Sequence, residues 1–192
     1  MAQRRQIRAS RSLEGEGERP ARGYGEPEAG ACANNVAILA RMSNGENNIR
    51  MIDVGAKPVS LRTARASGRL VGRPETIAAI RGGNLAKGDA VATARLAGVM
   101  AAKKTSEIVP LCHPLPLDAI EMAIGFEPEA VVIEAVVRAT AKTGVEMEAL
   151  VAVSAAALAI YDMAKSIDPG MTITAVQLEE KTGGARGDYG RA

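Results

Sequence analysis

The chain has 192 residues, a formal net charge of +2 and an aromatic content of 2%, with one Phe and no Trp. So mild a charge gives no sign of a nucleic-acid surface, and the scarcity of aromatic side chains disfavours proteins that stack single-stranded bases. A core of Ala, Val, Ile, Leu and Met buries less area per element than one with aromatic side chains, which favours oligomerisation as a further source of burial.

The first 45 residues differ from the rest of the chain. Arg, Glu, Gly and Pro dominate them and no apolar period is present, so we predict a disordered tail over residues 1–45. Its acidic content argues against a transit peptide, and nothing resembles a signal peptide. Cys32 and Cys112 make no disulfide framework. We expect a cytoplasmic protein with a folded domain over residues 46–182 and a flexible, Gly-rich C-terminus over residues 183–192.

The first half of the folded domain contains two extended segments followed by two helices. We predict these elements over residues 51–54, 60–70, 75–81 and 90–104. Pro74 occupies the first position of the earlier helix, and Asp89 caps the later one. In the later helix the residues with core spacing are Leu96, Val99 and Met100.

The second half contains a hairpin, a long helix and a last strand. Apolar and polar residues alternate over residues 118–126, and residues 127–129 turn the chain into a second strand over residues 131–140. A helix over residues 145–167 and a strand over residues 171–179 follow. This order fits an α+β fold of the ferredoxin-like βαββαβ kind, in which helices pack against an antiparallel sheet.

The helix over residues 145–167 is apolar nearly all round and carries charges only at its ends, so we predict that it is buried and that the chemistry lies at its ends. It reaches the length of a membrane span, but its charged ends and Ser154 fit a soluble pattern, and we expect no membrane contact. Glu148 and Asp162 are about 21 Å apart along a straight helix. If both serve one nucleotide-sized ligand, a second subunit must supply one of them.

The start of this helix is a candidate anion site. Lys142, Thr143 and Gly144 join a strand to its N-terminus, where free N–H groups attract phosphate, although the glycine spacing is not that of a P-loop. Glu146 and Glu148 have two interpretations. They either match the helix dipole or accept the N–H groups of a base.

The end of the helix carries Asp162 and Lys165, one turn apart on the same face. An exposed ion pair there would contribute under about 1 kcal/mol. A partly buried Lys would instead lose its proton readily and serve as an acid or base near neutral pH. Lys87, just before the Asp89 cap, is most simply part of a surface turn.

His113 is the only histidine, and it follows Cys112 in a loop stiffened by prolines. A metal site needs three or four converging ligands, and no spacing motif supplies them, so we expect no metal. Two alternatives stay open for His113. It has a purely structural role, or it holds a substrate and moves a proton.

Several segments resemble the cyclic pyranopterin monophosphate synthases of molybdenum-cofactor biosynthesis. No single segment is a general motif, but they occur in the order of that family from Met51 onward, and the combination is specific. The segments are MIDV (51–54), KGD (87–89), ATAR (92–95), LCHPL (111–115), KTGVEMEAL (142–150), IYDM (160–163) and KTGG (181–184).

The resemblance implies a ferredoxin-like subunit assembled as a homohexamer, a trimer of dimers with sites between subunits. It implies a lyase that converts (8S)-3',8-cyclo-7,8-dihydroguanosine 5'-triphosphate into cyclic pyranopterin monophosphate and releases pyrophosphate. The partner is then a nucleotide-derived small molecule, with no nucleic acid and no membrane. No cofactor is expected, and Mg²⁺ accompanying the triphosphate is left open.

The resemblance also assigns roles to residues. Its catalytic positions fall on Asp162, Lys165, Lys87 and His113. Its substrate-binding positions fall on Leu111, Cys112, His113, Glu146, Met147 and Glu148, with Thr143 and Arg62 placed for phosphate or ligand contact.

Two positions depart from the family pattern. Ala141 stands where the family usually has glycine, and Ala164 where cysteine is common, which affects local packing only. A non-catalytic nucleotide-binding oligomer on the same scaffold is the alternative function, and loss of a key Lys or Asp would have marked it. A structural oligomer with incidental charges is a third interpretation.

Overall fold

The structure is a computed structural model that describes residues 49–185 and 187–192. Its elements, all within the unit Arg50–Ala192, run along the chain in the order β1 (Ser60–Val71), α2 (Pro74–Arg81), α3 (Ala90–Ala102), α4 (Thr105–Ile108), β2 (Ala119–Glu127), β3 (Ala130–Ala141), α5 (Glu146–Ala164), β4 (Thr172–Thr182) and β5 (Tyr189–Gly190). The predicted tail over residues 1–45 lies outside the described residues.

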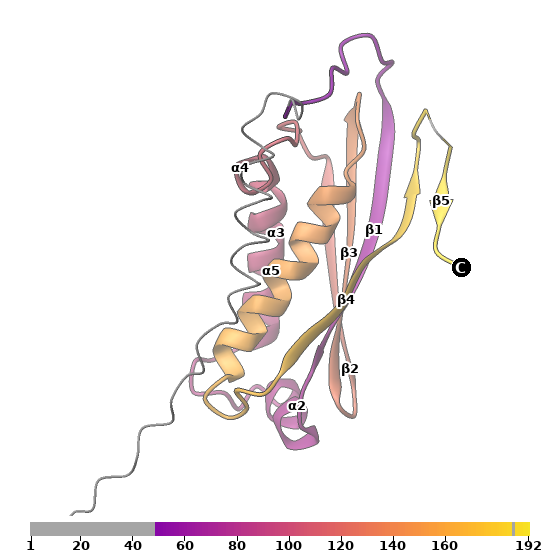
Figure 1. Ribbon diagram of the computed structural model, residues 1–192. Helices are drawn as coiled ribbons and strands as arrows, with labels where there is room; N and C mark the ends of the chain where they lie inside the picture. Colours follow the sequence, from indigo (N-terminus) through magenta and orange to yellow (C-terminus); the bar gives the residue numbers. More distant parts are fainter. Residues whose placement is uncertain (1–48, 186) are drawn as a thin grey trace, which may run out of the picture. The chain divides into compact units, whose positions relative to one another are not determined.

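The strands form one antiparallel sheet in the order β2-β3-β1-β4-β5, with α3 and α5 packed on one face (Figure 1). The first four strands have the order and connections of the ferredoxin-like βαββαβ fold, as the sequence predicts. The predicted hairpin is β2 and β3, which pair from Ala119 opposite Arg138 to Glu127 opposite Ala130.

Alternate side chains of β1 point into the core and onto the open face of the sheet. Arg62, Ala64, Ala66 and Leu70 are buried on the side of the helices. The alternating residues, among them Arg65, lie on the open face, as the period of a strand requires. The small buried residues leave room for α5 to lie close to the sheet.

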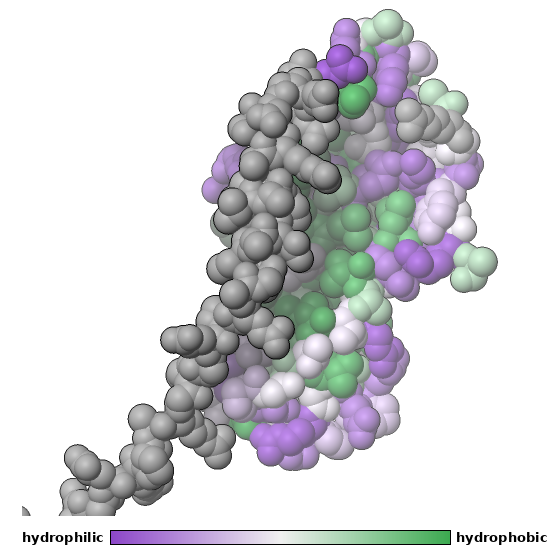
Figure 2. Space-filling model, in the orientation of Figure 1, coloured by the Kyte–Doolittle hydropathy of each residue, from purple (hydrophilic) through white to green (hydrophobic). Residues whose placement is uncertain are grey.

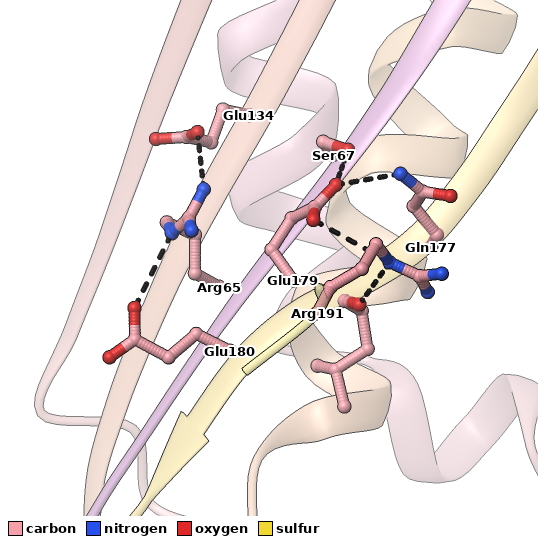
Figure 3. Close-up of polar contacts among 8 residues, drawn as sticks. Arg65, Ser67, Glu134, Gln177, Glu179, Glu180 and Arg191 are labelled. Atoms are coloured by element: carbon pink, nitrogen blue, oxygen red, sulfur yellow. Dashed lines mark hydrogen bonds and ion pairs between the residues drawn. The ribbon is translucent and has the colours of Figure 1, made fainter. Parts of the chain in front are cut away.

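Ion pairs between neighbouring strands cover the open face (Figure 3). Arg65 lies 3.1 Å from Glu134 on β3 and 3.7 Å from Glu180 on β4. Glu179 accepts hydrogen bonds from Ser67 and Gln177, which lower its pKa. Cross-strand pairs of this kind satisfy the charges locally and add modestly to sheet stability.

The α3 helix corrects one prediction. Leu96 and Met100 were expected in the core, but they are 61% and 53% exposed, and Val99 is half-buried. The buried face consists of small residues, including Ala94 and Gly98. Both faces of α3 are apolar, and the face of small residues allows the closer approach to α5.

Two terminal segments also differ from expectation. Residues 51–54 form no strand, because the Gly55 amide donates to Oδ1 of Asp53 at 2.7 Å and the chain turns there. The C-terminus was expected to be flexible, but Tyr189 and Gly190 form β5 and pair with the end of β4. A strand of two residues is too short to show the alternation of apolar and polar residues by which strands are predicted from sequence.

The α5 helix is long and apolar enough, by length and composition, to cross a membrane. Here it packs against the sheet, and Ala149, Ala152, Val153 and Ala156 are fully buried. It begins and ends within a few residues of the predicted bounds, and Lys165 forms its C-cap. Burial on the sheet accounts for its apolar inner face.

The contact between α3 and α5 predicts the effect of enlarging Gly98. A Cβ there would lie 2.7 Å from Cε of Met122 and 3.0 Å from the carbonyl oxygen of Ala152. We expect Gly98→Val to lower the free energy of unfolding by about 1–3 kcal/mol through overpacking. Urea denaturation measures this, and the control Ala92→Val, on the exposed side of α3, should change it by only a few tenths of a kcal/mol.

Candidate functional site

A cavity of about 470 Å³ opens at the N-terminal end of α5. Five separate segments build its wall, namely the stretch before β1, the start of β1, the loop after α4, the β3–α5 connection and the end of β4. In Figure 1 these segments meet at the upper end of the domain. Residues far apart in the sequence therefore face one space.

The cavity collects every residue that the sequence predicts to bind substrate. These side chains come from three of its wall segments, and no predicted binding residue lies elsewhere. They are Arg62, Leu111, Cys112, His113, Thr143, Glu146, Met147 and Glu148.

Cationic groups surround the cavity. Lys57, Lys142 and Lys181 line it together with Arg62, which is only 5% exposed and donates from Nε to the carbonyl oxygen of Ala141 at 3.3 Å. Sequence reasoning did not assign roles to Lys57 and Lys181. Lys181 begins one of the segments on which the family resemblance rests, whereas Lys57 carried no signal.

Two carboxylates in the cavity have different surroundings. Nζ of Lys181 is 3.0 Å from Oε1 of Glu146, so that charge is paired. Glu148 is 4% exposed, and burial, followed by the nearby charge of Glu146, raises its pKa. Glu148 is therefore a hydrogen-bond acceptor that is largely shielded from water.

The Cys112 thiol also lines the cavity. Burial, together with the charge of Glu148, raises its pKa, so Cys112 is not an activated nucleophile.

The first turn of α5 adds hydrogen-bond donors. Its N-cap residue, Val145, makes no side-chain capping bond, so no capping side chain competes with a ligand for the N–H groups of this turn. Thr143 and Gly144 precede it at the cavity wall. With the helix dipole and the surrounding lysines, this end of α5 suits an anion.

The other end of α5 carries a second cluster. Asp162 lies between two lysines, with Oδ2 2.7 Å from Nζ of Lys87 and Oδ1 2.8 Å from Nζ of Lys165. Hydrogen bonds from Lys165 and Lys87 lower the pKa of Asp162 to about 2. Lys87, which the sequence alone left as part of a surface turn, thus belongs to a Lys–Asp–Lys cluster.

This cluster corrects the sequence reasoning about Lys165. A partly buried lysine with a lowered pKa was one of two interpretations. Its side chain is instead 53% exposed, and the hydrogen bond and charge of Asp162 raise its pKa. In the single chain Lys165 is a stabilised cation.

One chain does not unite the two clusters. His113 lines the cavity at the start of α5, while Lys87, Asp162 and Lys165 lie at its end, near α2 in Figure 1. The helix places Glu148 and Asp162 about 21 Å apart. Within the described residues, no group of three or more His, Cys, Asp or Glu side chains converges as a metal site would need.

The protein is thus an α+β protein of ferredoxin-like fold, with a cavity at one end of α5 whose cationic lining suits an anionic small molecule and a Lys–Asp–Lys cluster at the other end. The MoaC family model matches residues 51–184. The chain belongs to the MoaC family.

Curated relatives agree with the family match. The chain is 52% identical over 143 residues to a cyclic pyranopterin monophosphate synthase of Streptomyces avermitilis, covering 74% of this chain and 84% of that protein. It is 52% identical over 149 residues to the protein of the same name in Brevibacillus brevis, covering 77% and 93%. It is also 52% identical over 145 residues to cyclic pyranopterin monophosphate synthase 3 of Mycobacterium tuberculosis H37Rv, covering 74% and 81%. The predicted family is confirmed.

Glu148 generates a pH-dependent prediction. Because its folded pKa is raised, ionisation opposes folding, so stability falls as pH rises from the ordinary range of Glu through the folded pKa. We expect Glu148→Gln to raise Tm at pH 7.5 by about 2–4 °C, as about 1 kcal/mol does in a domain of this size. Calorimetry at pH 7.5 and pH 4 measures the difference, which should vanish at the lower pH.

The control for this experiment is Glu107→Gln, an exposed carboxylate 3.9 Å from Lys104. It should leave Tm almost unchanged at both pH values. An equal gain from Glu148→Gln at both pH values would contradict the electrostatic explanation.

Proposed function

We propose that the protein is a cyclic pyranopterin monophosphate synthase, a lyase of molybdenum-cofactor biosynthesis. Its substrate is (8S)-3',8-cyclo-7,8-dihydroguanosine 5'-triphosphate, and its products are cyclic pyranopterin monophosphate and pyrophosphate. The family membership and the names of the relatives support the activity. The observation that carries the proposal for the site is the cavity at the start of α5, where all the predicted substrate-binding residues meet.

The cavity offers complementary groups to both parts of this substrate. Lys57, Lys142 and the free N–H groups of α5 can hold phosphate oxygens and offset their charge. Glu148 can accept N–H groups of the purine-derived ring from its buried position. A hydrogen bond to a buried carboxylate discriminates strongly against rings that lack the donor.

The reaction needs several proton transfers and one displacement at phosphorus. Ring opening and reclosure move protons between heteroatoms, for which Lys87, Lys165 and His113 are the proposed carriers. A sugar hydroxyl then attacks the α-phosphate, the bond to the β-phosphate oxygen breaks, and pyrophosphate leaves. Cations stabilise the charge on the leaving group, and Mg²⁺ bound to the triphosphate could share that role.

Asp162 has a positioning role in this proposal. With a pKa of about 2 it is ionised at neutral pH and does not carry a proton itself. It holds the ammonium groups of Lys87 and Lys165 2.7 and 2.8 Å from its two carboxylate oxygens. Removing its side chain would take the carboxylate partner from both lysines and leave Lys87 only the carbonyl oxygen of residue 162, to which its Nζ donates at 3.1 Å.

The assembly is part of the proposal. The two clusters lie at opposite ends of α5, which supports sites shared between subunits. The family resemblance implies that the assembly is a homohexamer, a trimer of dimers. The partner is then a small nucleotide-derived molecule, without nucleic acid, membrane or a bound cofactor. The pathway supports a cytoplasmic location.

Single substitutions in the cluster test the activity. We expect Lys87→Ala and Lys165→Ala to fold normally and to lose product formation by at least about 10²-fold, the usual contribution of a proton-transfer group. We expect a similar loss for Asp162→Ala, because its carboxylate positions both lysines. Chromatography of the pterin product and a pyrophosphate assay measure this. Lys104→Ala, which removes a lysine with a 59% exposed side chain, is the matched control and should keep full activity.

Wild-type turnover by any of the three variants would remove that residue from its proposed role. Tight binding of the substrate by the wild-type protein without either product would instead favour the non-catalytic nucleotide-binding oligomer.

The assembly has its own test. Light scattering of the purified 19.9 kDa chain should give the mass of six copies. A stable monomer with full activity would contradict an active site that is divided between subunits.

A further inference from the structure

The β4 strand carries an extra residue where it passes the middle of β1. Arg65 on β1 pairs with Glu180. The next residue of β1, Ala66, pairs with Leu178, so Glu179 is left between the two pairs. This is a β-bulge, in which two residues of one strand oppose a single residue of the other. A bulge re-aims the side chains that follow it along the strand.

The bulge decides which face of the sheet Lys181 points to. Directly paired residues place their side chains on the same face, and Lys181 pairs with Ala64, which is fully buried under the helices. Glu179 and Glu180 both lie on the open face (Figure 3), so the next residue turns to the helical side. There Nζ of Lys181 lies 3.0 Å from Oε1 of Glu146 in the cavity wall. A regular strand would instead put Glu180 on the helical side and Lys181 on the open face.

Both flanks of the bulge are fixed. On one side Leu178 packs against the hydrophobic core. On the other side Gly183 lies so close to β1 that an added Cβ would be 1.9 Å from the carbonyl oxygen of Leu61. The carbonyl oxygen of Gly183 also accepts a hydrogen bond from Oγ of Ser60 at 2.9 Å. The strand must therefore fit one extra residue between these two points, and the contacts of that residue decide where it lies.

The contacts of Glu179 hold the extra residue at its position. Its Oε1 accepts hydrogen bonds from Oγ of Ser67 and, at 2.9 Å, from Nε2 of Gln177. Its Oε2 lies 3.5 Å from Nε of Arg191, and its carbonyl oxygen accepts from the amide of Arg191 at 2.8 Å (Figure 3). The side chain and the backbone of the bulged residue both have fixed partners.

Glu179 is covered in a part of the surface that is otherwise polar. Figure 2 shows mostly hydrophilic residues along the edge of the molecule where β4 and β5 lie. The side chain of Glu179 is only 16% exposed, whereas that of Glu180 is 52% exposed and lies 3.7 Å from Arg65. Covering an ionised carboxylate costs free energy unless hydrogen bonds replace its water. The set of donors around Glu179 meets this requirement and keeps the carboxylate in one place.

We infer that Glu179 is a positioning residue for the cavity, because it holds the bulge that turns the ammonium group of Lys181 into the cavity wall. Arg191 supports it, since β5 pairs with Glu180 and Lys181 on the outer side of β4. Placed in this way, Lys181 offsets the charge of Glu146, which would otherwise repel phosphate. The inference rests on the proposed function where it concerns the substrate, and on strand pairing alone where it concerns Lys181.

Lysine labelling tests the placement without any assay of activity. Full-length Glu179→Val replaces the bulged carboxylate by a residue that suits a regular strand. We expect Lys181 to lose its place beside Glu146 and to react with acetic anhydride several-fold faster than in the wild-type protein. Mass spectrometry measures this rate relative to that of Lys104, an internal standard whose side chain is 59% exposed in the wild type.

The matched control is Glu180→Val, which removes a carboxylate from the next residue on the same face. It should leave the labelling of Lys181 almost unchanged, and equal acceleration in both variants would overturn the inference. Ser67→Ala covers the chance that Glu179→Val does not fold, because it removes only one hydrogen-bond donor to the bulge. It should accelerate labelling by a smaller factor, and wild-type labelling in both Ser67→Ala and a folded Glu179→Val would reject the role of Glu179.

A deletion separates positioning from simple stabilisation of the strand. Removing Glu179 outright takes away the extra residue, so β4 can pair regularly and Lys181 stays opposite Ala64. We expect the deletion variant to label Lys181 more slowly than Glu179→Val does, although it removes the same side chain and its backbone as well. Equal acceleration by the deletion and the substitution would show that Glu179 only stabilises the strand.

Steady-state kinetics tests the consequence for the substrate. Glu179→Val should raise KM several-fold and lower kcat less, because Lys181 lines the cavity and is not among the proposed proton carriers. Glu180→Val should keep both values. An unchanged KM with accelerated labelling would reject a role of this placement in binding. Accelerated labelling in Glu179→Val, with no product from the wild-type protein, would reject the proposed function and leave the positioning of Lys181 standing.

Discussion

The contact between α3 and α5 is made by small side chains, with Gly98 so close to the carbonyl of Ala152 that an added Cβ would lie 3.0 Å from it. Most of the structure depends on this contact. Because Ala and Gly face inward, two helices can lie side by side on one sheet without aromatic residues in the core. The larger side chains Leu96 and Met100 must then point outward, where they leave apolar surface for another molecule to cover.

The same packing sends the charges to the ends of α5. A helix body that is buried on the sheet cannot carry ionised groups without large desolvation costs, so Glu146, Glu148 and Lys165 lie at its two ends. The start of the helix combines free N–H groups with lysines and suits an anion. The other end joins two lysines through Asp162. The fold thus places the cation-lined cavity and the Lys–Asp–Lys cluster at opposite ends of one helix.

The period of the sequence predicted the sheet, the hairpin and α5, because alternation and helical spacing are local properties. It failed for Leu96 and Met100, since both faces of α3 are apolar and only the contact with α5 decides which is inside. The sequence period also did not predict β5, because this short strand is defined only by its pairing with β4. The cavity was predictable only through the family resemblance, because five distant segments build it. Lys57 carried no signal, since it joins the cavity through tertiary structure alone.

The electrostatics of the Lys–Asp–Lys cluster limit the proposed mechanism. Hydrogen bonds from Lys165 and Lys87 lower the pKa of Asp162, and Asp162 in turn raises the pKa of Lys165, so the free chain holds Lys165 as a cation that can donate a proton but cannot accept one. A proton acceptor would then be a group outside the cluster, and the imidazole of His113, which lines the described cavity, is the proposed one. Because His113 is at the far end of α5 in the same chain, the proposed acid and base could meet only across two subunits.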